Sequence, residues 1–204
     1  MSHFEHSKEF ADVRPYTQVI NAAAGTKKGG VSLFNPGFGW GNVSDTGSLL
    51  PFQDPVKEKE RLRHLGSHLA VRNIRLDDLL AHVPPPRAPK FVWDTMKLDV
   101  QGADGDAMAS AGDYVDNFIC VVGEFDGLYY VLPEGVKKHF EFLKEHRFRC
   151  VHDMWPGNSI WLNERHIDLY KENPKRFGCH TVYDSKADVA KLIENYEKGG
   201  LGCT

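Results

Sequence analysis

The sequence predicts an α/β fold in which helices cover a mostly parallel sheet. Residues 91–100 and 117–123 are two largely apolar runs, a pattern typical of strands that are buried on both faces. Between them, residues 103–112 are mostly small and predict a short helix. Strand, helix and strand in this order indicate a parallel pair joined by a right-handed crossover.

The elements that precede this unit follow from turn residues and alternation. Residues 18–25 predict a short buried strand that ends in small residues. A hairpin turn is expected over 27–30, with residues 31–34 as the returning strand of the same hairpin. A further strand is expected over 69–74, and a short helix over 75–80 begins with acidic residues, where the helix dipole favours them.

The C-terminal half is expected to combine helices with a pair of antiparallel strands. Residues 135–146 are amphipathic with a helical period. The runs 148–153 and 159–163 flank a Trp-Pro-Gly-Asn turn and predict an antiparallel hairpin. Helices are expected over 165–171 and 185–198, the second with an apolar stripe on one side.

Composition limits the classes of function. The 204 residues carry a net charge of −3 and are 41% hydrophobic, which suits one domain with a sizeable core. Basic residues are not clustered, so no nucleic-acid partner is expected. No apolar stretch reaches the length of a bilayer span, so no membrane partner is expected. The first ten residues lack the order of a signal peptide, and the expected location is cytoplasmic.

The four cysteines are far apart in the sequence. Cys120 lies in an apolar run and is interpreted as a buried thiol rather than part of a disulfide framework. Cys150 with His152, and Cys179 with His180, do not have the spacing of a zinc knuckle, so no metal site is expected.

Acidic residues stand at the carboxyl ends of both central strands. Asp99 ends the first and Glu124 the second, so both carboxylates are expected at one edge of the sheet. In open α/β sheets this edge binds ligands. Gly102 allows a sharp turn after Asp99. Lys97 alternates with Asp99 and is expected on the same face, where it pairs with a carboxylate or extends to the strand end.

Each of these residues also has a structural interpretation. Asp99 would cap the following helix, and Glu124 would pair with a nearby cation. His152 is either a general base that faces the crevice or a structural histidine, and the second is favoured. The polar and glycine-rich loop 35–55 would cover a substrate, or form an ordinary surface loop.

The order of these motifs resembles the FkbM family of methyltransferases. Residues 75–80 (Arg-Leu-Asp-Asp-Leu-Leu) resemble the family's Leu-Asp-Asp-Leu-Leu segment. Residues 96–104 (Met-Lys-Leu-Asp-Val-Gln-Gly-Ala-Asp) resemble its lysine-isoleucine-aspartate-valine-glutamate-glycine-alanine-glutamate signature. Residues 121–124 (Val-Val-Gly-Glu) resemble the next strand, and residues 21–25 the strand before the family's hairpin. Gln101 and Asp104 replace two glutamates of the signature.

The resemblance implies a Rossmann-like class I methyltransferase sheet, mostly parallel with an antiparallel last hairpin. It implies transfer of a methyl group from S-adenosylmethionine to a hydroxyl on a sugar or another small molecule. Asp99 would orient the acceptor or take its proton, with Glu124 and Lys97 in the same crevice. Ala22 and Ala23 would line the adenine side of the cofactor pocket, and Gly102 would approach the cofactor closely.

The family's first strand and its glycine-rich cofactor loop have no counterpart before residue 18. We therefore expect a short N-terminal segment over 1–16, an N-terminally truncated methyltransferase domain over 17–165 and a helical extension over 166–204. The alternatives are a non-catalytic binding domain that keeps this fold, and a fragment of a longer gene product. A sheet without those strands would expose an edge, through which a homo-oligomer would form.

Overall fold

The computed structural model describes most of the segments that were expected to form the sheet. The described residues are 20, 22–26, 28–34, 50, 54, 56, 69–82, 92–125, 135–153, 158–174, 176, 177, 179 and 189–203. The predictions for residues 1–16 and for most of the loop 35–55 lie outside the described residues.

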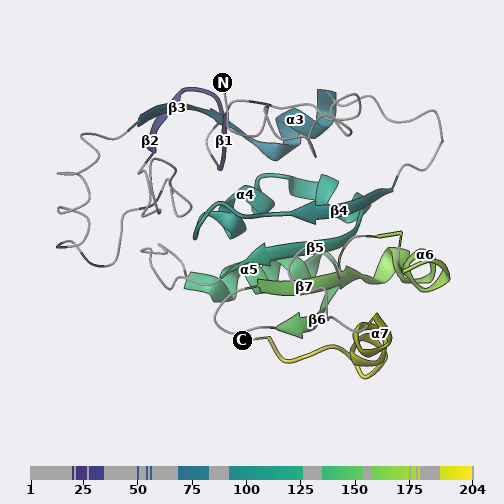
Figure 1. Ribbon diagram of the computed structural model, residues 1–204. Helices are drawn as coiled ribbons and strands as arrows, with labels where there is room; N and C mark the ends of the chain where they lie inside the picture. Colours follow the sequence, from purple (N-terminus) through teal and green to yellow (C-terminus); the bar gives the residue numbers. More distant parts are fainter. Residues whose placement is uncertain are drawn as a thin grey trace, which may run out of the picture.

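The main sheet has four strands in the order β4-β5-β7-β6 (Figure 1). Strands β4 (Trp93–Lys97) and β5 (Phe118–Glu124) are parallel, as predicted. Strand β7 (Asn158–Asn163) is antiparallel to β5 and to β6 (Phe148–Asp153), which confirms the predicted antiparallel pair. The carboxyl ends of β4, β5 and β6 therefore meet the amino end of β7 at one edge.

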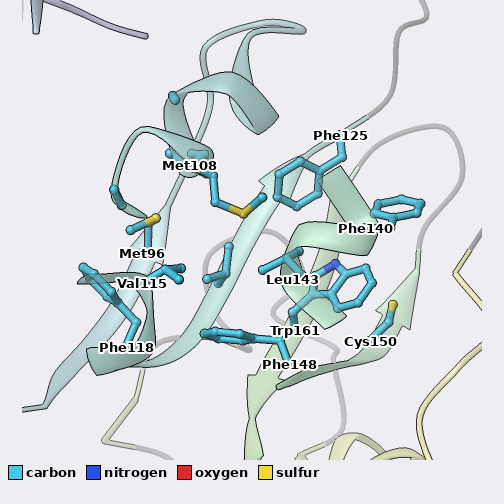
Figure 2. Close-up of a cluster of buried hydrophobic side chains, with 14 of the residues drawn as sticks. Met96, Met108, Val115, Phe118, Phe125, Phe140, Leu143, Phe148, Cys150 and Trp161 are labelled. Carbon is cyan, nitrogen blue, oxygen red and sulfur yellow. The ribbon is translucent and has the colours of Figure 1, made fainter. Parts of the chain in front are cut away.

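Short helices cover the first face of this sheet. They are α4 (Asp104–Ala109), the 3₁₀ helix η3 (Gly112–Asn117) and α5 (Gly135–Glu145). Figure 2 shows the cluster that they enclose, in which Phe140 and Leu143 of α5 lie against Trp161 of β7. The Phe140 and Trp161 ring centroids are 5.2 Å apart. Burial of such large apolar side chains is the main source of the sheet's stability.

The C-terminal residues cover the second face. The 3₁₀ helix η4 (Glu164–His166) leads into α6 (Ile167–Glu172), and α7 (Val189–Glu197) follows. Tyr170, Leu192 and Tyr196 pack in one cluster with sheet residues such as Val122 and Ile160. The segment predicted as a helical extension therefore supplies one of the two layers of the core.

A smaller sheet of three strands has the order β1-β3-β2. Its strands are β1 (Ala23–Ala24), β2 (Val31–Phe34) and β3 (Leu69–Ile74). The prediction that β1 and β2 pair as a hairpin is wrong, because β3 lies between them, parallel to β1 and antiparallel to β2. The connecting turn is hydrogen-bonded to β3, because the Asn73 backbone amide donates to the Gly30 carbonyl at 3.1 Å.

Helix α3 (Leu76–His82) links the small sheet to the main core. Ser110, which follows α4, accepts a hydrogen bond from the Leu76 amide at its hydroxyl (3.0 Å) and one from the Asp77 amide at its carbonyl (3.0 Å). Leu76 and Leu80 pack against the first core cluster. These bonds satisfy amides of the first helical turn that have no partner within the helix.

All four cysteines form disulfides, so the prediction of a buried Cys120 thiol is wrong. Cys120 of β5 is bonded to Cys179, and Cys150 of β6 is bonded to Cys203. The partners are 59 and 53 residues apart in sequence, so the spacing of the cysteines does not indicate which of them are bonded. Among the described residues, no helix is long and apolar enough to span a bilayer.

Candidate functional site

The parallel pairing of β4 and β5 brings the two predicted carboxylates to one edge. Lys97 pairs in register with Val122, so Asp99 and Glu124, two residues further along each strand, are level with each other. The Leu98 amide donates to the Val122 carbonyl at 2.8 Å and continues the pairing beyond β4. The predicted location of Asp99 and Glu124 at the carboxyl ends of neighbouring strands is thus found in the structure.

Side chains at this edge form a connected polar group. The Lys97 ammonium is 3.1 Å from an Asp99 carboxylate oxygen and donates to the Leu98 carbonyl at 2.8 Å. The Gln101 amide nitrogen donates to Asp99 at 3.0 Å and to Glu124 at 3.3 Å. Gln101, which replaces a glutamate of the FkbM-like signature, therefore bridges two carboxylates that would repel a third.

The turn after Asp99 uses two consecutive left-handed residues. Gln101 has φ 53° and Gly102 has φ 84°. A non-glycine residue in this region is uncommon and is held there by its surroundings. The two hydrogen bonds from the Gln101 side chain provide such a restraint, and Gly102 is buried within the turn.

Asp104, at the start of α4, was noted in the sequence as a replacement within the FkbM-like signature but was not among the predicted site residues. Its side chain is fully buried, one oxygen accepts from the Val100 amide at 3.4 Å, and the other has no hydrogen-bond partner. The pKa of Asp104 is raised to about 7, chiefly by burial. The Val100 hydrogen bond opposes this shift, and the charges of Asp99 and Glu124 add to it. The small residues around Asp104, namely Gly102, Ala103 and Gly105, were the feature of the sequence that could have indicated its burial. Small residues let neighbouring groups approach the backbone closely.

Helix α4 meets α5 at Gly105. A Cβ atom at this position would overlap the ring of His139, so only glycine allows the two helices to pack this closely. The buried His139 ring lies beside Asp106, with 3.9 Å between its Nε2 atom and a carboxylate oxygen. The neighbouring His139 lowers the pKa of Asp106.

The predicted adenine-side residues lie in the other sheet. Ala23 pairs with Asn73 in the small sheet, and Ala22 precedes it. The neighbouring Ala24 packs against the first core cluster, to which Met96 and Leu98 of the β4 segment belong. The structure therefore places β1 against the same core as the Asp99 edge, but it gives no contact between Ala22 or Ala23 and the carboxylates.

Two further polar residues lie along the same edge. Asn158 begins β7 and pairs in register with Glu124, and His152 of β6 pairs with Ile160. The Asn158 Oδ1 atom and the His152 Nε2 atom are both buried without a hydrogen-bond partner. The expectation of His152 as a satisfied structural histidine is therefore wrong for its Nε2 atom, and Asn158 was not predicted.

In the part of the chain that the structure describes, no group of metal ligands lies at the Asp99 edge, and a cavity lies elsewhere. Within the described ranges, no three His, Cys, Asp or Glu side chains are grouped so as to hold a metal ion. A cavity of about 300 Å³ lies at the amino end of β6, lined by Lys144, Arg147, Arg149, Trp161 and Glu164 among others. It includes none of the predicted site residues and lies away from the Asp99 edge.

These features define an α/β protein with a group of polar side chains at the carboxyl ends of its parallel strands. Comparison of the chain with protein-family models, with curated proteins and with solved structures finds no match. The assignment of a function therefore depends on the chemistry of the edge itself and on the resemblance of its motifs.

Proposed function

We propose that this chain is a methyltransferase domain that uses S-adenosylmethionine to methylate a hydroxyl on a sugar or another small molecule. The observation that carries the proposal is the group formed by Lys97, Asp99, Gln101 and Glu124 at the ends of two adjacent parallel strands. This is the edge where open α/β sheets bind ligands, and it contains the segment that resembles the FkbM signature.

The topology of the main sheet supports the same proposal. The resemblance implies a Rossmann-like sheet with a reversed last strand, and β7 is reversed between the mutually parallel β5 and β6. Many unrelated proteins share mixed sheets, so the strand order supports the fold and the side chains at the edge support the chemistry.

The residues at the edge fit the proposed cofactor. S-adenosylmethionine supplies an electrophilic methyl group on a positively charged sulfur. Asp99 and Glu124 are anions that attract a cation, and carboxylates accept hydrogen bonds from ribose hydroxyls. The left-handed turn at Gln101 and Gly102 allows the close backbone approach that such a ligand needs.

The side chains of this chain would prepare the acceptor for attack. Asp99 would accept a hydrogen bond from the acceptor hydroxyl, orient its oxygen and take its proton. The oxygen–methyl bond would form as the methyl–sulfur bond breaks, which leaves the sulfur as a neutral thioether. Lys97, at 3.1 Å, and the Gln101 amide hold the Asp99 carboxylate in place. Holding the reactants in line would supply much of the rate enhancement.

One observation favours a second candidate, a non-catalytic binding domain of the same fold. The four edge side chains satisfy one another through an ion pair and two amide hydrogen bonds, as a purely structural group would. In that case Asp99 would be needed for stability and not for methyl transfer.

Isothermal titration with S-adenosylmethionine, together with release of its demethylated product in the presence of hydroxyl acceptors, separates the two candidates. Methyl transfer predicts binding heat and a turnover that Asp99→Asn lowers about a hundredfold or more, with an unchanged melting temperature. Asp94→Asn, an exposed aspartate on the same strand, is the matched control and keeps full turnover. Absence of both heat and a melting shift at millimolar cofactor would refute the methyltransferase proposal.

A further inference from the structure

Strand registers place polar side chains on one face at the carboxyl edge. Residues paired across neighbouring strands project to the same face of a sheet. Val122 pairs with Lys97 on one side and Ile160 on the other, and Val122 and Ile160 both belong to the second core cluster. Two residues nearer the edge, Glu124 and Asn158 form the next pair on that face.

An irregularity in β6 adds His152 to the same face. The register between β6 and β7 shifts between Cys150 and His152, so His152 pairs with Ile160. Cys150 belongs to the first core cluster, and regular alternation would have placed His152 on that face as well. The bulge instead turns His152 toward the face of Ile160, and bulges commonly re-aim a side chain beside a binding site.

Two atoms of this row are buried without partners. Asn158 Oδ1 and His152 Nε2 make no hydrogen bond, and leaving such an atom unpaired destabilises the folded state. Buried polar atoms are otherwise almost always paired. Two unpaired atoms from adjacent strands, next to Glu124, indicate a place where an outside molecule completes the bonding.

We propose that Asn158 and His152 form a subsite for the hydroxyl groups of a neutral, sugar-like acceptor. An amide oxygen accepts from a hydroxyl, and an imidazole nitrogen either donates to it or accepts from it, so both atoms suit a neutral hydroxyl group. The subsite lies beside Glu124 on the edge that also holds Asp99. The inference rests on the proposed function for the role of the bound molecule as methyl acceptor.

Two variants and a matched control test the subsite. Asn158→Leu and His152→Leu remove the unpaired atoms, and Asn117→Leu changes an exposed asparagine of η3. Neutral monosaccharides (glucose, galactose and mannose) are titrated calorimetrically into the full chain at millimolar concentration. We expect at least one sugar to bind, with affinity about tenfold lower in each subsite variant and unchanged in the control.

A stability measurement distinguishes this role from a structural one. Because the two atoms have no partners, Asn158→Leu and His152→Leu should leave the melting temperature unchanged or raise it. Loss of stability in both variants, no heat with any sugar, or undiminished sugar binding by both variants would each overturn the subsite.

The same samples titrated with S-adenosylmethionine separate the two proposals. Cofactor heat without sugar heat refutes the subsite alone. Sugar heat that the subsite variants weaken, without cofactor heat, supports the subsite and refutes the methyltransferase.

The disulfides independently lead us to infer that this chain matures in an oxidising compartment. Each bridge joins a sheet strand, β5 or β6, to the C-terminal part of the chain. Cys120 and Cys179 lie in the second core cluster, and Cys150 and Cys203 lie in the first. The four cysteines, Cys120, Cys150, Cys179 and Cys203, are at most 2% exposed. Redox-sensing cysteines are accessible to solvent, whereas buried pairs of this kind are structural and are rare in the cytosol.

Formation of each bridge needs an oxidant. Two thiols release two protons and two electrons, and a disulfide-bonded oxidant takes them up and becomes a dithiol. Alkylation of free thiols at lysis of cells that make the protein, followed by denaturation and mass spectrometry, tests this inference. We expect no alkylated cysteine and two bridged peptide pairs, Cys120 with Cys179 and Cys150 with Cys203. Four alkylated cysteines in the folded chain, or different pairs, would overturn it.

Discussion

Replacement of Asp104 by asparagine should change how the stability of this protein depends on pH. The ordinary pKa of an aspartate is 3.8, and burial raises that of Asp104 to about 7 in the folded state. The folded state therefore holds this proton more tightly than the unfolded state. Its contribution favours folding at low pH and is lost as pH rises from about 4 to about 7.

The size of the effect follows from the two pKa values. A shift of one pKa unit corresponds to about 1.4 kcal/mol, so wild type should lose about 4 kcal/mol relative to Asp104→Asn between pH 4 and pH 8. Asparagine has the same shape and cannot ionise. The variant should therefore be the more stable protein at pH 8, although the two are similar near pH 4.

Urea unfolding followed by fluorescence of the buried Trp161 measures this difference. Asp106→Asn on the same helix is the control. The neighbouring His139 lowers the pKa of Asp106, so the folded and unfolded pKa values of this group both lie below 5 and its contribution is constant above that pH. A difference between Asp104→Asn and wild type that stays within about 0.5 kcal/mol from pH 4 to pH 8 would refute the buried, protonated carboxyl.

Three further predictions concern packing and are checked by urea unfolding at pH 7. Gly105→Ala should cost about 1–3 kcal/mol, because the new Cβ overlaps the His139 ring, and wild-type stability would contradict the close helix contact. Asn163→Leu should cost at least about 2 kcal/mol, since three hydrogen bonds of this buried amide are lost; a neutral result would contradict them. Leu192→Ala should cost about 2–5 kcal/mol, and a smaller loss would show that α7 is not part of the core.

Local patterns predicted the elements of the main sheet well. The apolar runs around Met96 and Val121 became β4 and β5. The expected burial on both faces holds for β5, whereas β4 is buried at Met96 and exposed at Asp94 and Lys97. The same reasoning located Asp99 and Glu124, since the position of a residue at a strand end follows directly from the strand itself.

Features that depend on distant partners were not predictable in this way. The insertion of β3 between β1 and β2 depends on a segment about 40 residues further along the chain. The burial of Asp104 depends on how α4 packs, and an acidic residue in a first helical turn is usually exposed. The unpaired atom of His152 results from a bulge, which alternation in the sequence does not reveal.

The two disulfides overlap along the chain, because Cys150 lies inside the loop closed by Cys120 and Cys179, and Cys203 lies outside it. Every peptide bond from Cys120 to Cys203 is thus enclosed by at least one covalent ring. A protease that cuts once anywhere in this stretch would leave both pieces joined, and the nicked molecule would keep all of its residues until a reductant was added. The half of the chain that carries Glu124, Asn158 and His152 is therefore protected from loss of fragments.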